Sequence, residues 1–422
     1  MNDLAGKKLL LLGGSKPYVK VAKAAKKLGV RVIVVDKNAT EEILGLADEY
    51  IRLSLLDIDE IKEFCGEHHI DGVLNFCVDF AQRTYQEICE KFSLPGCYSK
   101  KQVDVLANKT LFKKMLADCG LETILTYSEN DILEDKVRYP IIIKPSESSG
   151  SRGSTTCFDK KDALIGLKRA AGESRSGDVI IEEFIQGAQE VQITYFLKDS
   201  RVYVIRTADS YEGNKQDGLE RVVACAISPS RYSDRYFADT HASVLRMIEK
   251  LGLHDGPFFM QGFFHDGKFK FFDPGCRFPG VDFDSVYKLE FGVDIAEMMV
   301  RYALLGKMPE TDIADDMYKL HGKMAAVLFP VMKCGKMSKI NGLDAVENNP
   351  KVFSISKRHV IGDEITLSHD VNQRFGEIDI ITDGFDDLKD QIRNIQNSLS
   401  ILDENGNEML YSHFDVERII IN

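Results

Sequence analysis

The sequence predicts an α/β fold whose N-terminal part is a doubly wound parallel sheet. Short apolar, β-branched runs at residues 8–12, 31–36 and 72–76 have the character of buried parallel strands. Apolar residues at helical spacing fill the intervals between these runs, at residues 19–28 and 59–68. Because a repeated strand–helix–strand order places helices on both faces of a parallel sheet, these segments predict the doubly wound arrangement.

The remaining elements follow a mixed order of strands, loops and helices. A helix is expected to begin near Asn108 and to end at Gly120, and another covers residues 242–251. The Asp266-Gly267 pair predicts a hairpin turn between two apolar strands. The last helix is marked by Phe385, Leu388, Ile392 and Ile395, and the remaining strands are expected at residues 141–144, 179–182, 258–264, 268–272, 324–331 and 377–381.

Length and composition limit the class of protein. A chain of 422 residues corresponds to roughly three domains of ordinary size. Acidic residues outnumber basic ones by 66 to 54, which argues against a partner such as nucleic acid or an anionic membrane. Nine dispersed cysteines without a Cys-x-x-Cys pair favour a reducing compartment, and no apolar run approaches the ~18 residues of a membrane span. We therefore expect a cytoplasmic globular protein, with a homodimer left open.

A glycine turn after the first strand is one candidate site. Gly13, Gly14 and Ser15 follow the strand, and Asp36 ends the next one, which is where a dinucleotide would place its pyrophosphate and ribose. The full Gly-x-Gly-x-x-Gly motif is not present. A tight β–α turn is the favoured interpretation, and a nicotinamide dehydrogenase stays an alternative.

A second set of residues indicates a triphosphate site because its parts occur in a consistent order. Lys144 ends a buried strand, where its charge requires an anionic partner. The Ser/Gly-rich loop at residues 148–153 can fold its N–H groups over phosphates. Acids follow at Glu182, Glu183 and Glu190, and later come Gln261, Asp273 and Arg277. Oxygen ligands and an arginine are what a magnesium-bound triphosphate requires.

In these motifs, over about residues 1–310, the sequence resembles the ATP-grasp superfamily, which includes the carbamoyl-phosphate synthase large subunit, phosphoribosylglycinamide synthetase and L-amino-acid ligases. The resemblance implies a Rossmann-like domain at residues 1–100 and an ATP-grasp domain at 101–310, with a lid subdomain at about 110–185. A smaller α+β domain at 311–422 would complete the chain.

The resemblance also implies roles for individual residues. A basic residue on the helix after Asn108, Lys109, would reach the ATP phosphates, and Glu182, Glu183 and Ile185 would meet the adenine. Glu190 would bind the ribose. The implied ATP-binding set is Lys109, Lys144, Ser148, Ser149, Gly150, Ser151, Gly153, Glu182, Glu183, Ile185 and Glu190.

The metal strand departs from the family pattern of Glu-x-Asn-Pro-Arg. Gln261 and Asp273 would bind magnesium, or manganese in its place, but Gly275 stands where the asparagine ligand belongs. We expect water or a carboxylate from Asp282 or Asp284 to fill the gap, and Gly275→Asn to be tolerated. A regular two-residue turn would put Gln261 and Asp273 on opposite faces, so a shared metal requires a bulge or a three-residue turn.

The implied activity is that of an ATP-dependent carboxylate–amine ligase. A substrate carboxylate would attack the γ-phosphorus, and an amine would displace phosphate from the acylphosphate, with Arg277 stabilising the developing oxyanion. A phosphoribosylglycinamide synthetase-like or carbamoyl-phosphate synthase-like enzyme is the alternative within the family. From another class, a non-catalytic ATP-binding regulatory protein is supported by Gly275.

Overall fold

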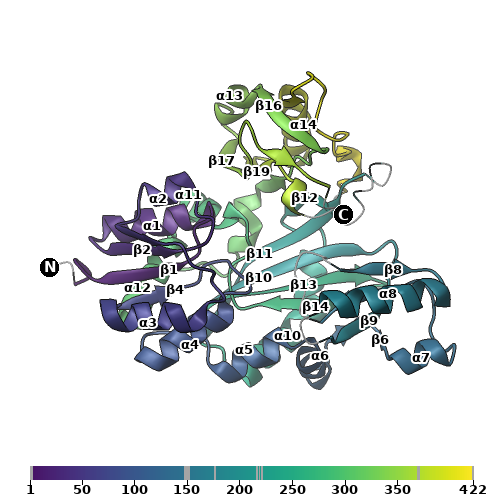
Figure 1. Ribbon diagram of the computed structural model, residues 1–422, viewed down its shortest axis with the longest axis horizontal. Coiled ribbons are helices and arrows are strands. Elements are labelled where there is room, and N and C mark those ends of the chain that lie inside the picture. Colours follow the sequence, from purple (N-terminus) through teal and green to yellow (C-terminus); the bar gives the residue numbers. More distant parts are fainter. Residues whose placement is uncertain are drawn as a thin grey trace.

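The computed structural model describes residues 3–146, 153–174, 177–214, 217, 219, 222–367 and 371–420. Figure 1 shows an N-terminal α/β region at one end of the molecule and a small sheet covered by α8 (Lys160–Glu173) at the other. A large sheet lies between them, and the C-terminal region stands above it. No helix among the described residues is both long and apolar enough to cross a membrane.

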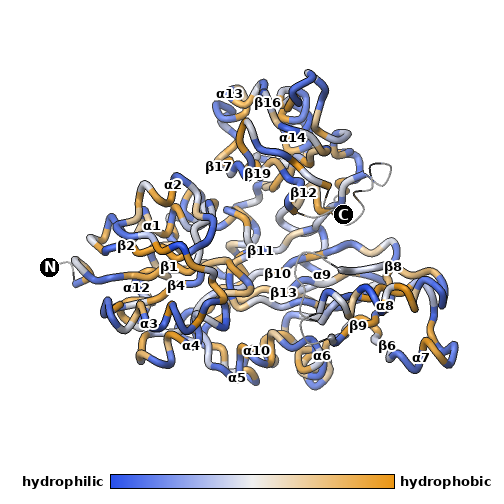
Figure 2. The backbone as a smooth tube through the Cα atoms, in the orientation of Figure 1, coloured by the Kyte–Doolittle hydropathy of each residue, from blue (hydrophilic) through white to orange (hydrophobic). Residues whose placement is uncertain are grey.

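The N-terminal sheet is parallel and has the strand order β3-β2-β1-β4. Figure 2 shows apolar residues along β1 and β2, and Leu9–Leu12 are fully buried. The predicted doubly wound sheet is therefore confirmed, with strand and helix ends within a few residues of those expected. Its elements are β1 (Lys8–Leu12), α1 (Pro17–Lys27), β2 (Arg31–Val35), α2 (Glu41–Leu44), β3 (Glu49–Ile51), α3 (Ile58–His68), β4 (Gly72–Leu74), α4 (Gln82–Phe92) and α5 (Lys100–Ala107).

The glycine turn after β1 is closed by its own neighbours. The Gly14 N–H donates to Asp36 Oδ2 at 2.7 Å, so the acid at the end of β2 binds the turn itself. Gly13 has φ +136°, and a Cβ there would lie 2.6 Å from the Tyr18 ring. These contacts favour the interpretation as a tight β–α turn over that of a dinucleotide site.

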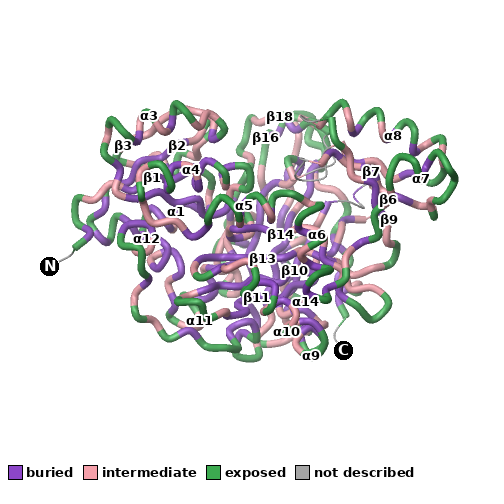
Figure 3. Tube along the Cα trace, turned by 90° about the horizontal axis from the view of Figure 1, so that it is seen from below, coloured by how far each residue is buried: buried purple, intermediate pink, exposed green. Residues whose placement is uncertain are grey.

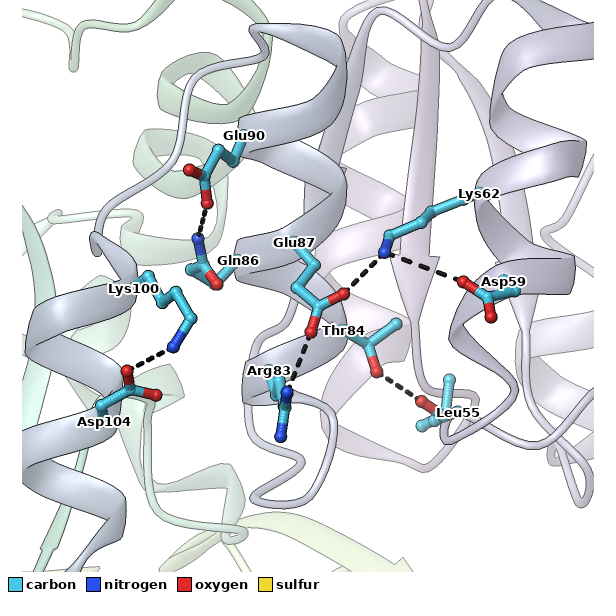
Figure 4. Close-up of polar contacts among 10 residues, drawn as sticks. All are labelled: Leu55, Asp59, Lys62, Arg83, Thr84, Gln86, Glu87, Glu90, Lys100 and Asp104. Atoms are coloured by element: carbon cyan, nitrogen blue, oxygen red, sulfur yellow. Dashed lines mark hydrogen bonds and ion pairs between the residues drawn. The ribbon is translucent and has the colours of Figure 1, made fainter.

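Polar contacts join the outer helices α3 and α4 (Figure 4). Lys62 Nζ lies 2.6 Å from Glu87 and 3.9 Å from Asp59, and Thr84 Oγ1 donates to the Leu55 carbonyl at 2.6 Å. Lys62, Glu87 and Thr84 are partly or fully buried, whereas Asp59 is exposed, and an ion pair with an exposed partner contributes only about 0–1 kcal/mol. We assign them a structural role on the surface of the N-terminal region.

The central sheet has nine strands in the order β17-β19-β15-β12-β11-β10-β13-β14-β5. β5 runs parallel to β14, and the other pairs are antiparallel. Three C-terminal strands extend the same sheet that carries the ATP-grasp motifs, and β10, β11 and β13 lie in the buried centre (Figure 3). The strands are β5 (Glu122–Thr123), β10 (Gln189–Lys198), β11 (Arg201–Glu212), β12 (Val223–Ser228), β13 (Gly256–His265), β14 (Lys268–Gly275), β15 (Met324–Leu328), β17 (Val352–Lys357) and β19 (Gly376–Thr382).

The small sheet of the lid region has its own core. Its strand order is β6-β9-β7-β8, formed by β6 (Thr126–Tyr127), β7 (Ile141–Pro145), β8 (Thr155–Cys157) and β9 (Val179–Glu183). Ile141, Ile143 and Ile181 pack with Ala163 and Ala170 of α8 in a cluster separate from the main core. A region with its own core can move relative to the large sheet.

The remaining helices connect the regions. α6 (Lys109–Asp118) contacts β14, and α12 (Ile295–Leu305) returns to pack on α1 and β4 of the N-terminal sheet. The C-terminal helix α14 (Phe385–Ser398) buries Leu388, Ile392 and Ile395 as predicted. The other elements are α7 (Glu129–Leu133), α9 (Ser233–Asp239), α10 (His241–Leu251), η2 (Asp282–Asp284), α11 (Ser285–Phe291), η3 (Met317–Gly322), β16 (Gly335–Asn341), α13 (Leu343–Glu347), β18 (Glu364–Ile365), η4 (Val371–Gln373), β20 (Ser400–Asp403) and η5 (Val416–Arg418).

Candidate active site

One face of the nine-stranded sheet collects the predicted ligands of the triphosphate. Residues paired across neighbouring strands share a face. Asp273 on β14 pairs with Gln261 on β13, which pairs with Gln192 on β10. Glu190 lies two residues before Gln192 on the same strand and therefore faces the same side.

The hairpin between β13 and β14 contains the bulge that a metal shared by Gln261 and Asp273 requires. Asp266 and Gly267 form a two-residue turn, both with positive φ (50° and 75°). The register shifts after Gln261, so that Gln261 lies opposite Asp273 instead of Phe272. The prediction of a bulged hairpin is confirmed, and it places a carboxylate and an amide side by side on one face.

Two lysines from different elements converge on Glu182. Lys144 Nζ of β7 and Lys113 Nζ of α6 each lie 2.5 Å from one Glu182 oxygen, and Glu182 is 1% exposed. Burial alone would raise the pKa of Glu182, but the two ammonium groups outweigh it and lower that pKa. Ile142 pairs with Glu182 across β7 and β9, so the acid and Lys144 share a face as diagonal neighbours.

Lys109 lies near the same group at the start of α6. Burial lowers the pKa of Lys109, and the charge of Lys144 lowers it further, against the opposing effect of Asp273. Asn108 caps this helix by accepting from the Leu111 N–H at 3.0 Å. The charge of Lys109 is thus disfavoured by that of Lys144 and favoured by that of Asp273.

Asp273 is the acid at the centre of these cations. Burial raises the pKa of Asp273; Lys109, Arg277 and Lys144 lower it, and Asp79 raises it. Arg277 Nε donates to Asp79 Oδ1 at 3.1 Å, which ties the end of β14 to the loop after β4. A carboxylate with three neighbouring cations forms the mixed-charge surroundings that metal-bound phosphates require.

The adenine and ribose candidates lie at the end of β9 and the start of β10. Glu183 is half-exposed, with Lys270 Nζ 3.9 Å away, and Ile185 is half-buried in the segment that follows β9. Burial raises the pKa of Glu190 to about 7, and the nearby Glu212 acts in the same direction. An acid that exchanges its proton near neutrality can accept hydrogen bonds from hydroxyl groups when it is ionised.

Most of the predicted phosphate loop is not described. Ser148, Ser149, Gly150 and Ser151 lie outside the described residues, and Gly153 is the first residue after them. Gly153 has φ +70°, and a Cβ there would lie 2.8 Å from Pro145. This position therefore requires glycine, in agreement with a tight return of the chain against the lysine strand.

The expectation for Gly275 was wrong. A Cβ at Gly275 would lie 2.1 Å from the Phe259 ring, so an aromatic side chain fills the place of the missing asparagine. Asp282 and Asp284 do not fill it either, because both form ion pairs with Lys20 of α1. Phe259 pairs with Gly275 across the hairpin, which is why the ring lies directly over the glycine.

The residues present fit one magnesium ion at this site. Gln261 and Asp273 supply an amide and a carboxylate oxygen, and magnesium commonly completes its six ligands with phosphate and water oxygens. Among the residues that the structure describes, no group of three or more His, Cys, Asp and Glu side chains is arranged to hold a metal. A site of this kind depends on the nucleotide for its remaining ligands.

Three residues in or beside the candidate site were not predicted from the sequence. Lys113 lies one helical turn after Lys109, and this spacing was the available signal. Asp79 lies in a loop and Lys20 in a helix of the N-terminal region, and no sequence pattern indicates that either would lie near Arg277 or Asp282. Only the packing of that region against the large sheet reveals them.

Residues 108–274 match the family model of the carbamoyl-phosphate synthase L chain, ATP binding domain. This region of the chain belongs to the ATP-grasp family. The matched region runs from the cap of α6 to the residue after Asp273, and so contains the candidate lysines, acids and metal ligands. It makes up the centre of this ATP-grasp protein.

Curated relatives extend the similarity beyond this region. A formate-dependent phosphoribosylglycinamide formyltransferase from Prochlorococcus marinus (strain NATL2A) is 22% identical over 333 residues, covering 73% of this chain and 84% of the relative. The corresponding protein of Ignicoccus hospitalis is 26% identical over 249 residues, covering 55% and 56% of the two chains.

Solved structures share the fold along nearly the whole chain. The L-amino acid ligase from Bacillus licheniformis has a TM-score of 0.77 at 19% identity, covering 95% of this chain and all of that one. The biotin carboxylase from Campylobacter jejuni has a TM-score of 0.74 at 16% identity, covering 97% and 94%. The ATP-grasp fold therefore includes the N-terminal and C-terminal regions of this protein as well as its centre.

Proposed function

We propose that this ATP-grasp protein is an ATP-dependent ligase that joins a carboxylate to an amine through an acylphosphate. The observation that carries the proposal is the convergence of Lys109, Lys144 and Arg277 around Asp273 on one face of the large sheet. The family match and the relatives that bear names of carbon–nitrogen bond-forming enzymes support it. Nine free thiols support a location in the reducing cytoplasm.

ATP would bind between the lid sheet and the central sheet. Lys109 and Lys144 would contact its phosphates, Glu183 and Ile185 its adenine, and Glu190 its ribose, while Glu182 holds Lys144 in place. The loop containing Ser148–Ser151 and Gly153 would cover the phosphates. Gln261 and Asp273 would hold magnesium, or manganese in its place, which would neutralise charge on the transferred phosphoryl group.

The proposed reaction requires the protein to position its substrates and does not require a nucleophilic side chain. A carboxylate oxygen of the substrate attacks the γ-phosphorus, and ADP leaves with the electron pair of the broken P–O bond. The amine then attacks the acyl carbon, and phosphate leaves. Arg277, held by Asp79 at 3.1 Å, would stabilise the oxyanion because its guanidinium donates two parallel hydrogen bonds.

A coupled assay tests this function. Purified protein with magnesium and ATP is screened for ADP release against amino acids and small carboxylates, each with and without an amine, and products are identified by mass spectrometry. We expect ADP release that depends on both substrates and an amide product. ATP binding without turnover on any substrate would favour the non-catalytic regulatory protein.

A second candidate follows from the curated relatives. Formate as the carboxylate and phosphoribosylglycinamide as the amine are included in the screen because two relatives carry these substrates in their names. Formation of a formylated product would select this candidate over an amino-acid ligase. Size-exclusion chromatography with light scattering would test the homodimer, which a related carboxylase domain forms.

A further inference from the structure

A second group of charged residues lies on the same sheet face, at its opposite end. Glu190 on β10 pairs with Ser210 on β11, and the row continues through Ala226 and Val327 to Asp379 on β19. Each pair shares a face, so Asp379 faces the same side of the sheet as the nucleotide candidates. Glu377 lies two residues before Asp379 and faces the same side.

Asp379 is a buried carboxylate without a hydrogen-bond partner. Its exposed fraction is 0%, and neither Oδ1 nor Oδ2 finds a donor in the part of the chain that the structure describes. An unpaired buried charge is costly, and buried polar groups almost always have a partner. The missing partner is therefore a proton or a group outside the residues that the structure describes.

The surroundings of Asp379 contain a surplus of acids. Asp282 accepts from Ser354 Oγ at 2.7 Å, and Ser354 pairs with Asp379 across β17 and β19. Glu377 and Asp282 both raise the pKa of Asp379 after burial, and Lys20 and Arg206 act against them. Lys20 is already paired with Asp282 and Asp284, and no donor among the described residues reaches Asp379. The charges of Arg374 and Arg358 act on Glu377 and lower its pKa against the effect of burial.

Arg206 is the other charged group near Asp379. It is 4% exposed and donates to Ser228 Oγ at 3.0 Å and Gln192 Oε1 at 3.2 Å, both neutral partners. It borders a cavity lined by Thr194, Ile205, Phe278, Phe283 and Asp284, and Thr194 Oγ1 also has no hydrogen-bond partner in the described chain. Asp379 and Thr194 are therefore two unpartnered polar groups on one sheet face, and Thr194 lines this mainly apolar cavity.

The acid pair is connected to the candidate reaction centre. Cys77 is close enough to Arg277, Lys20 and Asp284 for all three charges to act on its pKa. Asp282 follows Arg277 by five residues and reaches Ser354 beside Asp379. The segment that follows Arg277 therefore lies beside the strands β17 and β19, which place Ser354 opposite Asp379.

From these contacts we infer that Glu377 and Asp379 bind the positively charged amino group of a substrate, so that this protein acts on a compound with a primary ammonium group. The inference rests on the proposed function for the site of reaction. An ammonium group donates three hydrogen bonds, which two carboxylates on one strand can share. A metal ion fits less well, because no three ligating side chains converge among the described residues.

A binding experiment with a simple cation tests the acid pair. The full-length protein is titrated by calorimetry with n-propylammonium chloride and, separately, with n-butanol, a neutral molecule of similar shape. We expect the ammonium ion to bind at least about tenfold more tightly than the alcohol. The Asp379→Asn substitution should lower the affinity for the ammonium ion at least about tenfold. Asp209→Asn is the matched control, since Asp209 is a buried aspartate (2% exposed) on the same sheet that is already satisfied by Ser230 and the Arg231 N–H.

The outcomes separate this inference from the proposed function. Equal affinity for ammonium and alcohol, or unchanged ammonium binding in Asp379→Asn, would show that Asp379 is a protonated core acid and would overturn the inference. If Asp379→Asn does not fold, Glu377→Gln is measured in its place with the same expectation. MgATP binding is titrated in each preparation. If the wild-type protein does not bind MgATP, the proposed function is refuted. If it binds MgATP but not the ammonium ion, only the inference about Glu377 and Asp379 is overturned.

Discussion

Asp273 and Asp379 are aspartates on one face of the same sheet, the first half-buried and the second fully buried, and their neighbours differ in the sign of their charge. Lys109, Arg277 and Lys144 all act on Asp273, and its carboxylate lies opposite the amide of Gln261. Asp379 instead has Glu377 and Asp282 near it, and no donor reaches its oxygens within the described residues. Burial raises the pKa of both carboxyl groups, so the neighbouring charges make the difference.

This difference indicates what each end of the sheet can bind. The end around Asp273 has more cations than acids, which suits a polyphosphate with its metal ion. The end around Asp379 has a buried carboxylate that no donor among the described residues reaches, which suits a cationic group. A ligase that joins a carboxylate to an amine needs both kinds of recognition, and here they lie on one continuous surface.

Replacing Asp273 should have the largest effect. Asp273→Asn removes the one anionic metal ligand, and we expect turnover to fall at least about a hundredfold because a bound metal contributes several kcal/mol to phosphoryl transfer. ADP release with the best substrate measures the loss. Asp266→Asn in the hairpin turn is the control, since asparagine tolerates its positive φ of 50°. Comparable activity of Asp273→Asn and wild type would contradict the metal assignment.

Lys144→Met should weaken ATP binding by about 1.5–3 kcal/mol, the range for a hydrogen bond to a charged group. The substitution also leaves Glu182 with Lys113 as its remaining ion-pair partner. Calorimetric titration with MgATP measures the change, and Lys136→Met provides a control because Lys136 is exposed and pairs only with Glu134 among the described side chains. Unchanged ATP affinity would argue against a phosphate role for Lys144.

The two ends of the sheet also differ in how well the sequence predicts them. The nucleotide end is made of short motifs, so Lys144, Gln261 and Asp273 can be recognised from local order, and the bulge follows from counting residues in the hairpin. The end around Asp379 combines Lys20, Asp282 and Asp379, which are between 97 and 359 residues apart in the sequence. Long-range packing of this kind leaves no local pattern.

The same limit explains the error at Gly275. The sequence shows a missing side chain, but the volume it leaves is filled by Phe259 from the opposite strand. Apolar alternation identified Phe259 as part of a strand without indicating which way its ring turns. The strand, helix and sheet class were predictable because they follow periodic patterns, whereas side-chain packing between strands does not.

Gly275→Asn is therefore expected to destabilise the protein by about 1–3 kcal/mol, the usual cost of overpacking a core. The double variant Phe259→Ala, Gly275→Asn removes the ring and should recover part of this loss, since the two residues are in contact. Denaturant unfolding of both single variants and the double variant measures the coupling. Additive effects would show that the ring does not occupy the place of the side chain.

The smallest expected effect is on the pH dependence of stability, through Glu377 and Asp379 at one end of the sheet. Because burial raises the pKa of Glu377 and of Asp379, the folded state holds more protons than the unfolded state between their ordinary and raised values. The free energy of unfolding should therefore fall as pH rises from 5 to 8. Glu377→Gln cannot ionise at this position, so its stability relative to wild type should increase over this interval by roughly 1–3 kcal/mol, since one pKa unit corresponds to about 1.4 kcal/mol.

Urea unfolding at pH 5, 6.5 and 8 measures this difference. Glu404→Gln is the control, because Glu404 is exposed and pairs with Lys336 at the surface, and its difference from wild type should stay nearly flat. Addition of n-propylammonium at pH 8 should stabilise the wild-type protein more than Glu377→Gln, because a cation that binds the ionised pair adds to the free energy of the folded state only. A pH-independent difference for Glu377→Gln would mean that Glu377 is ionised and compensated in the folded protein, and the contrast with Asp273 would then rest on Asp379 alone.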